Sequence, residues 1–188
     1  MPSIGLFRYP RLLWLLFVAL LVAADQIAKT YFANTIALGS GIEVTSWFNL
    51  VHVLNTGAAF SILADAGGWQ RYFFIAIGVV VVIGVTFASL MRRTDPFERK
   101  VGALVVAGGG GNLIDRIQSG AVVDYLDLHW RGLHWPAFNL ADIFVVAAVL
   151  AWLILSLKLQ LQSTSKSQLP ETGAVSYTHL TLPTSDLV

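Results

Sequence analysis

The chain has 188 residues and a formal net charge of +1, with 12% charged and 56% hydrophobic residues and a mean hydropathy of +0.69. A single soluble core of this size cannot hide so much apolar surface, so the composition predicts a membrane protein. It argues against a disordered chain, a nucleic-acid binder and a disulfide scaffold, and the lack of cysteine excludes thiol catalysis and thiolate metal sites.

Four stretches of the chain are candidates for helices that cross a bilayer, which takes about 20 mostly apolar residues. We predict spans at residues 12–31, 71–91, 101–117 and 138–158. The third stretch is the shortest and contains the run from Gly108 to Gly111. Such a run weakens a helix in water, but in a membrane it allows neighbouring helices to approach closely. The predicted fold is therefore an all-α integral membrane protein with four transmembrane helices.

The distribution of Lys and Arg predicts the orientation of these spans. With the N-terminus inside, the inner segments carry most of the basic residues, including Arg92, Arg93, Arg99 and Lys100. This bias predicts cytoplasmic N and C termini. One alternative stays open, because Arg8, Arg11 and the apolar residues that follow resemble a signal peptide cut just before Asp25.

The two predicted outer segments, residues 32–70 and 118–137, differ in character. The first alternates apolar and polar residues around Ile42 and Val44, which predicts a small extracytoplasmic β-like platform in this first outer loop. The second is rich in aromatic residues, which favour the membrane–water interface. We treat residues 1–160 as a single domain. Residues 161–188 predict a disordered cytoplasmic tail, and whether residues 175–188 are native stays open.

Polar groups converge at one predicted depth, near the outer leaflet. Span one rises about 20 Å at 1.5 Å per residue before it reaches its first charge, and spans three and four carry their charges at their outer ends. Four of the eight aspartates lie at this depth, together with three asparagines and an arginine: Asp25, Asp115, Asp124, Asp142, Asn55, Asn112, Asn139 and Arg116. Ionisable groups at membrane depth are costly and indicate a functional site.

Each of these residues also has a purely structural interpretation. Asp142 and Asn139 are suited to capping the start of the fourth span. Asp25 and Lys29 are four residues apart and suited to an ion pair on one helix face, and Asp115 can pair with Arg116. Convergence of the whole set at one depth is much harder to explain in this way.

The residue types that are present restrict the chemistry of such a site. The four histidines show no metal-binding spacing, so we expect no metal, and no nucleophilic-serine or phosphate-loop motif is present. We expect no cofactor either. Two carboxyl groups close together do not both ionise readily, so one keeps a proton while the other acts as a base. Such a pair activates water and protonates a leaving amine without a metal.

Five short motifs then resemble one family, the bacterial lipoprotein signal peptidases (signal peptidase II). They occur in order between residues 12 and 158 and are specific as a set. They are Asp25-Gln26 with Lys29; Asn55-Thr56-Gly57-Ala58-Ala59-Phe60; Gly111-Asn112-Leu113-Ile114-Asp115-Arg116; Val122-Val123-Asp124-Tyr125; and Pro136-Ala137-Phe138-Asn139-Leu140-Ala141-Asp142. The run of four glycines departs mildly from the family pattern, but it touches no chemical group.

The resemblance implies an aspartic endopeptidase of the bacterial inner membrane. Its substrates would be prolipoproteins that carry diacylglyceryl on a cysteine, and cleavage just before that cysteine would release the signal peptide. It would act without cofactor or nucleic acid, and we expect a monomer. The resemblance assigns the catalytic pair to Asp124 and Asp142, without saying which is the base. It assigns substrate binding to Asn55, Asn112, Arg116 and Asn139, and supporting roles to Asp25, Lys29, Gly57 and Asp115.

Two other functions are weighed against this one. A small proton-coupled transporter could use Asp25, Asp115 and Asp142 as a relay, but it would need polar groups throughout the membrane depth. A non-enzymatic membrane subunit could use its Asp–Arg pairs to hold helices together. In that case, Asp-to-Asn changes would loosen assembly without removing any catalysis.

Overall fold

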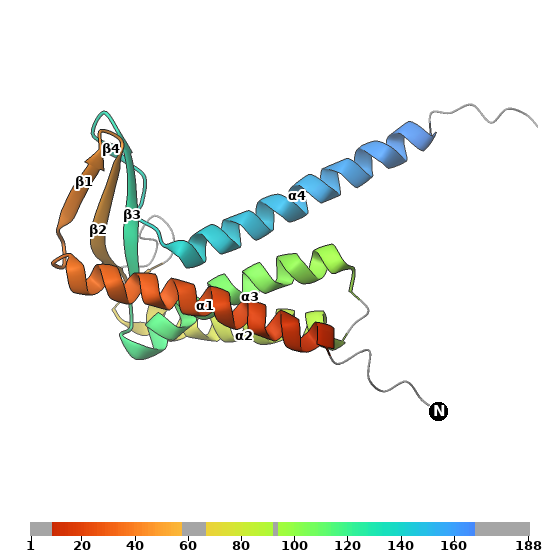
Figure 1. The fold of residues 1–188 in the computed structure, drawn as a ribbon, viewed down its shortest axis with the longest axis horizontal. Helices are drawn as coiled ribbons and strands as arrows, with labels where there is room; N and C mark the ends of the chain where they lie inside the picture. Colours follow the sequence, from red (N-terminus) through yellow and green to blue (C-terminus); the bar gives the residue numbers. More distant parts are fainter. Residues whose placement is uncertain (1–8, 58–66, 92–93, 168–188) are drawn as a thin grey trace, which may run out of the picture. The chain divides into compact units, whose positions relative to one another are not determined.

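A computed structural model describes residues 9–57, 67–91 and 94–167, with side chains from residue 11 to residue 161 of those ranges. Arg8, the predicted motif residues 58–60 and residues 168–188 of the predicted tail lie outside the described residues. The elements in Figure 1 are α1 (Tyr9–Thr35), β1 (Gly41–Thr45), β2 (Phe48–Asn55), α2 (Trp69–Met91), α3 (Pro96–Gln118), β3 (Val122–Trp130), β4 (Leu133–His134) and α4 (Leu140–Ser167). The chain divides into two compact units, of which the first ends at Ile154.

Helices occur at all four predicted positions, and three of them are long and apolar enough to cross a membrane. These candidate spans are Arg11–Thr35, Trp69–Met91 and Leu140–Leu161. α3 is also 23 residues long, but it carries Glu98, Arg99 and Lys100 near its start and further charges near its end. The structure thus supports a mostly helical membrane protein with three candidate spans, and a fourth span at α3 stays a prediction.

The helical part of the first unit is built around α3, which packs against both α1 and α2. Its core contains Trp14 and Val18 of α1 and Ala103, Val106 and Ala107 of α3. Trp14 also donates its indole N–H to the carbonyl oxygen of Arg99 at 2.7 Å. Trp14 and Val18 belong to the stretch that the alternative interpretation treats as a signal peptide, and here they contribute to the core.

α3 begins and ends at defined polar contacts. Asp95 caps its first turn by accepting the backbone N–H of Phe97, and a proline occupies the first helical position, where no N–H is needed. At the other end, Arg71 of α2 donates to the carbonyl oxygens of Arg116 at 3.0 Å and Ile117 at 2.7 Å. The guanidinium group adds donors to carbonyls at the end of the helix, and its positive charge lies at the negative end of the helix dipole.

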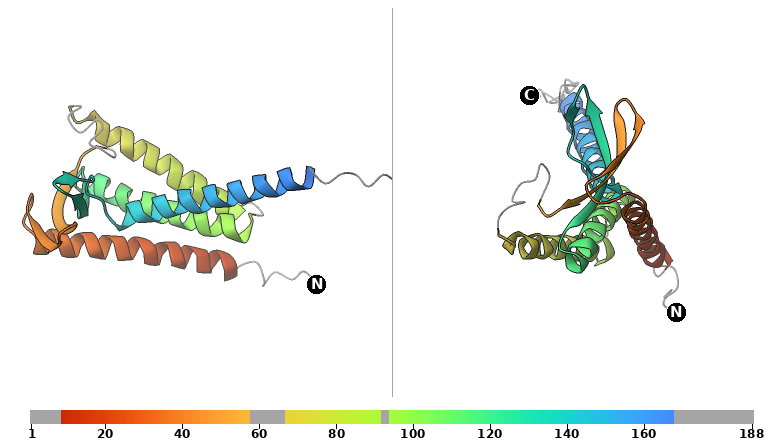
Figure 2. Two further views of the ribbon diagram at one scale, coloured as in Figure 1. Left: turned by 90° about the horizontal axis from the view of Figure 1, so that it is seen from above. Right: turned by 90° about the vertical axis from the view of Figure 1, so that its left-hand side faces the viewer.

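The four strands form one antiparallel sheet in the order β1-β2-β3-β4. Figures 1 and 2 show the sheet at the end of the helices where α1 and α3 finish. β1 and β2 lie in the segment for which the sequence predicts a β-like platform. β3 and β4, however, come from the segment between α3 and α4, for which the sequence pattern predicts no strand. The sheet is therefore built from both connecting segments.

The strand β3 escapes prediction because its aspartates interrupt the apolar pattern. Aspartate is depleted in strands, yet Asp124 and Asp127 are both buried in β3. Their carboxylates are held by side-chain amides of β2, Asn55 and Asn49 respectively. These cross-strand hydrogen bonds offset the cost of burying the two aspartates.

The C-terminal helix is longer than predicted. α4 continues to Ser167, so residues 161–167 of the predicted tail are helical. Lys158, Leu159, Gln160 and Leu161 all have favourable helix propensities, and they extend the helix past the apolar stretch.

Two glycines allow α3 to approach its neighbours closely. A methyl group at Gly108 would overlap the carbonyl oxygen of Ala141 in α4, and one at Gly111 would overlap the carboxylate of Asp25 in α1. Gly84 of α2, in contrast, faces open space. The glycine run therefore supports close helix packing, as its composition predicts.

We predict that Gly111→Ala destabilises the protein by about 1–3 kcal/mol, because the added methyl forces α1 and α3 apart. Gly84→Ala is the matched control and should cause no loss of stability. Thermal unfolding of the purified variants in one detergent measures the difference. Equal midpoints for the two variants would show that the close approach at Gly111 is not required.

Candidate active site

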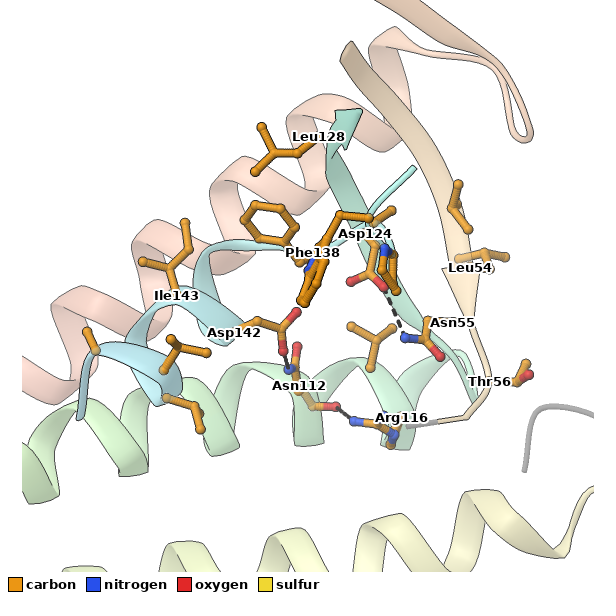
Figure 3. Close-up of a pocket in the computed structure, with 18 of the residues that line it drawn as sticks. Leu54, Asn55, Thr56, Asn112, Arg116, Asp124, Leu128, Phe138, Asp142 and Ile143 are labelled. Carbon is orange, nitrogen blue, oxygen red and sulfur yellow. Dashed lines mark hydrogen bonds between the residues drawn. The ribbon is translucent and has the colours of Figure 1, made fainter. Parts of the chain in front are cut away.

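A cavity of about 790 Å³ opens between the sheet, α3 and the start of α4 (Figure 3). Asp124 and Asp142, the predicted catalytic pair, both line it. Its polar lining also includes Asn55, Asn112 and Arg116. The rest of the lining is mostly apolar and comes from β2, β3, the segment before α4 and α4 itself: Val53, Leu54, Val122, Leu128, Trp135, Pro136, Ala137, Phe138, Ile143, Val145, Val146, Ala147 and Leu150, together with Thr56.

Asp124 is almost fully buried, with 2% of its surface exposed. One carboxylate oxygen accepts the side-chain amide of Asn139 at 2.6 Å, and the other accepts that of Asn55 at 3.1 Å. Burial, and then the nearby charge of Asp142, raise the pKa of Asp124 to about 7, although both amide donors act in the opposite direction. Near neutral pH, both the protonated and the ionised form of this carboxyl group are therefore populated.

Asp142 lies in the first turn of α4 and forms a reciprocal cap with Asn139. The side-chain oxygen of Asn139 accepts the backbone N–H of Asp142 at 3.0 Å, and the carboxylate of Asp142 accepts the backbone N–H of Asn139 at 3.2 Å. The other oxygen of Asp142 accepts the side-chain amide of Asn112 at 2.8 Å. Asp142 is thus held by a backbone and a side-chain donor at the start of α4.

Asn139 joins the two aspartates. It is fully buried, and its amide N–H₂ group contacts both Asp124 and the side-chain oxygen of Asn112 at 3.2 Å. Asn112 in turn holds Asp142. Two asparagines thus fix the separation and orientation of the two carboxyl groups, which lie 18 residues apart in the chain.

Lys29 is the buried cation beneath this arrangement, with 3% of its surface exposed. Its ammonium group donates to Asp25 at 2.8 Å, to Asp115 at 2.9 Å and to the side-chain oxygen of Asn112 at 2.7 Å. The bond to Asn112 turns the N–H₂ group of that side chain toward Asp142. The i,i+4 pair between Asp25 and Lys29 that the sequence predicts is present, and it is part of a larger network.

The two structural carboxylates tie the surrounding elements together. Asp25, which is fully buried, accepts the backbone N–H of Ala141 at 2.9 Å and so links α1 to α4. Asp115 accepts the side-chain amide of Gln26 at 2.8 Å and the backbone N–H of Val123 at 3.3 Å. Asp115 therefore joins α1, α3 and β3, and within the described residues it pairs with Lys29 rather than with Arg116.

Arg116 lies at the edge of the cavity and contacts the chain after β2. It donates to the carbonyl oxygen of Gly57 at 2.8 Å, and its guanidinium carbon lies 5.1 Å from the ring centroid of Phe74. The backbone N–H of Gly57 is accepted by the side chain of Asn55 at 3.0 Å. Gly57 and Asn55 therefore connect Arg116 to Asp124.

The structure brings all ten predicted site residues into this connected set. The sequence did not predict the structural contacts of Gln26, Arg71 and Tyr125. Tyr125 stacks on Phe32 of α1 and accepts the backbone N–H of Leu140. Of these, Gln26 and Tyr125 carried a signal, since they lie within the first and fourth motifs. In the part of the chain that the structure describes, no group of three or more His, Cys, Asp or Glu side chains is arranged to hold a metal ion.

Comparisons with known proteins agree on one family. A family model described as "Signal peptidase (SPase) II" matches residues 17–158. The lipoprotein signal peptidase of Serratia marcescens is 49% identical over 138 residues, which cover 73% of this chain and 81% of that protein. The lipoprotein signal peptidase of Cupriavidus necator is 46% identical over 143 residues, covering 74% and 80%.

A solved structure of a bacterial membrane enzyme is also similar to this chain. It superposes with a TM-score of 0.68 at 31% identity, and the match covers 77% of this chain and 87% of the other. A second solved bacterial membrane enzyme gives a TM-score of 0.66 at the same identity, with coverage of 77% and 92%.

We predict that Lys29→Met destabilises the protein by about 3–5 kcal/mol, because it leaves two buried carboxylates without their cation. Chemical unfolding in detergent measures this loss. Lys100→Met, at an exposed position, is the control and should have little effect. Adding Asp25→Asn to Lys29→Met should restore part of the stability, and a strictly additive double variant would contradict the coupling.

Proposed function

Because the chain belongs to the signal peptidase II family, a family of peptidases that remove signal peptides from lipoproteins, we propose that it cleaves diacylglyceryl-modified prolipoproteins just before the lipidated cysteine. Asp124 and Asp142 would activate the attacking water. One observation carries this proposal: both carboxyl groups line the same cavity and are joined through Asn139. We propose that the enzyme acts as a monomer, since a single chain supplies every residue of this set.

The two carboxyl groups differ in a way that assigns their roles. Asp124 is buried in a sheet, and its pKa of about 7 keeps the carboxyl group protonated below neutral pH. Asp142 lies at a helix N-terminus with two hydrogen-bond donors directed at it. We therefore assign the acid to Asp124 and the base to Asp142.

The reaction follows from these roles. Asp142 takes a proton from water while the water oxygen attacks the scissile carbonyl carbon, and Asp124 gives its proton to the carbonyl oxygen. The proton on Asp142 then passes to the leaving nitrogen, and the carbon–nitrogen bond breaks. A hydroxyl proton of the intermediate returns to Asp124, which restores the starting state of both carboxyl groups.

The lining of the cavity fits a substrate with one polar and several apolar parts. Asn55, Asn112 and Asn139 hold the carboxyl groups. Asn55 and Asn112 also line the cavity beside the proposed position of the reacting bond, and Arg116 provides a cation for the substrate backbone. Along α4 the lining becomes apolar, with Ile143, Val146 and Leu150 among its members. That part of the cavity is suited to acyl chains or to the apolar signal segment.

The membrane arrangement is part of the proposal. Three candidate spans support a multi-pass protein of the bacterial inner membrane, and we propose α3 as a fourth span. At 23 residues α3 is long enough, and packing against α1 and α2 covers part of its less apolar surface. From the bias of Lys and Arg, we propose that both termini lie in the cytoplasm and that the cavity lies near the outer leaflet.

We predict that Asp124→Asn and Asp142→Asn each lower cleavage of a lipid-modified prolipoprotein by at least about 10²–10⁴-fold, the usual contribution of a general acid or base. Glu98→Gln, an exposed carboxylate at the far end of α3, is the control and should retain the parent rate. The assay uses purified protein in detergent, and unfolding midpoints confirm that each variant is folded. Full activity of either folded aspartate variant would exclude the pair and favour a structural role for these residues.

We predict that the cleavage rate falls as the pH rises above about 7. The raised pKa of Asp124 means that its carboxyl group is protonated below this value and loses its proton above it. A deprotonated Asp124 cannot supply the proton that the carbonyl oxygen needs. The rate at limiting substrate across a pH series measures this, and a rate that keeps rising well above pH 7 would contradict the assignment of the acid.

A further inference from the structure

Outside the active site, the sheet contains a second cluster of polar side chains. The Nδ1 atom of His134 lies 2.9 Å from both carboxylate oxygens of Asp127, and the side-chain amide of Asn49 donates to Asp127 at 2.9 Å. Asp127 is 6% exposed, whereas His134 is largely exposed. His129 stacks on His134 and contacts the side-chain oxygen of Asn49 at 3.3 Å. None of these four side chains lines the active-site cavity.

This cluster supports β4, a strand too short to be held in the sheet by its own backbone hydrogen bonds. β4 has only two residues, and it pairs with β3 through His129–His134 and Trp130–Leu133. The turn between them places Arg131 and Gly132 at positive φ, as a tight two-residue hairpin requires. With so few backbone hydrogen bonds, β4 also depends on side-chain contacts with β3, namely the bond between His134 and Asp127 and the stacking of His134 on His129.

The residues directly after β4 form one wall of the active-site cavity. Residues 135–138, the cavity wall, all line that cavity. They run along β3, with Trp135 donating to the carbonyl oxygen of Leu128 at 2.8 Å and Phe138 exchanging hydrogen bonds with Leu126 at 3.0 and 2.9 Å. Besides these backbone bonds to β3, the wall is held by β4 before its start and by Asn139 after its end.

We propose that the contact between His134 and Asp127 positions the cavity wall and thereby sets substrate affinity; this inference rests on the proposed function. Both residues act through the wall and touch no reacting atom. Asn139 keeps its own bonds to Asp124, Asn112 and the carbonyl oxygen of Val123, so the catalytic carboxyl groups stay in place when the start of the wall is released.

The expected kinetic effect is therefore a change in KM without a change in kcat. A looser wall weakens binding of the substrate and of the transition state alike, which raises KM alone. His134→Ala removes one hydrogen bond to a charged group and should raise KM about fivefold or more. His134→Asn should restore much of the affinity, because its amide N–H₂ group occupies a position close to that of Nδ1.

The kinetic test measures cleavage of one diacylglyceryl-modified prolipoprotein peptide by the parent, His134→Ala and His134→Asn. Leu133→Ala, at the neighbouring exposed position of β4, is the matched control and should match the parent. A lowered kcat with unchanged KM in His134→Ala would overturn the proposal. The same holds if His134→Asn is no better than His134→Ala.

A second measurement is independent of catalysis. The chain has no cysteine, so Ala137→Cys introduces a single thiol in the cavity wall, and its rate of reaction with a maleimide reports how exposed the wall is. Adding His134→Ala should accelerate labelling several-fold, and adding Leu133→Ala should not. Equal labelling rates would overturn the proposal even if the peptide is cleaved normally. If the parent cleaves no lipidated peptide, the proposed function fails, while the labelling still tests the wall.

Discussion

The buried ammonium group of Lys29 is the interaction on which the rest of the site depends. It balances the carboxylates of Asp25 and Asp115 and donates to Asn112. Asp25 then accepts from the backbone of α4, and Asp115 from the backbone of β3. A single cation of α1 therefore fixes the elements that carry the two carboxyl groups proposed to be catalytic. The same network explains why glycine is needed at position 111, where α3 passes directly over Asp25.

On this support, the protein places two similar carboxyl groups in different surroundings. Asp124 is enclosed in the sheet, where burial favours the protonated form. Asp142 lies at the start of α4, where the backbone N–H of Asn139 donates to its carboxyl group. Asn139 bonds to both and keeps them together. The central claim is that this asymmetry lets the pair activate water directly, with Asp142 as base and Asp124 as acid.

The helices could be predicted because their signals are local. The candidate site residues were proposed from motifs shared with a known family, and the fold brings them together. Uncharged stretches mark the helices, and the few charged residues stand out within them. What could not be predicted depends on contacts between distant segments. β3 is a strand because Asn55 and Asn49 satisfy its buried aspartates. Arg71 looks like a flanking charge in the sequence, but it binds the end of α3. The contact between His134 and Asp127 likewise exists only because a tight hairpin brings β4 back onto β3.

The most direct test of the central claim is the source of the oxygen in the product. A single turnover in H₂¹⁸O, with enzyme in excess over a lipid-modified prolipoprotein, distinguishes attack by water from attack by an enzyme carboxylate. The account predicts one ¹⁸O atom in the new carboxyl group of the released signal peptide and none in Asp124 or Asp142. An unlabelled signal peptide, with ¹⁸O in the side chain of either aspartate, would show that a carboxylate attacks the substrate and would contradict the account.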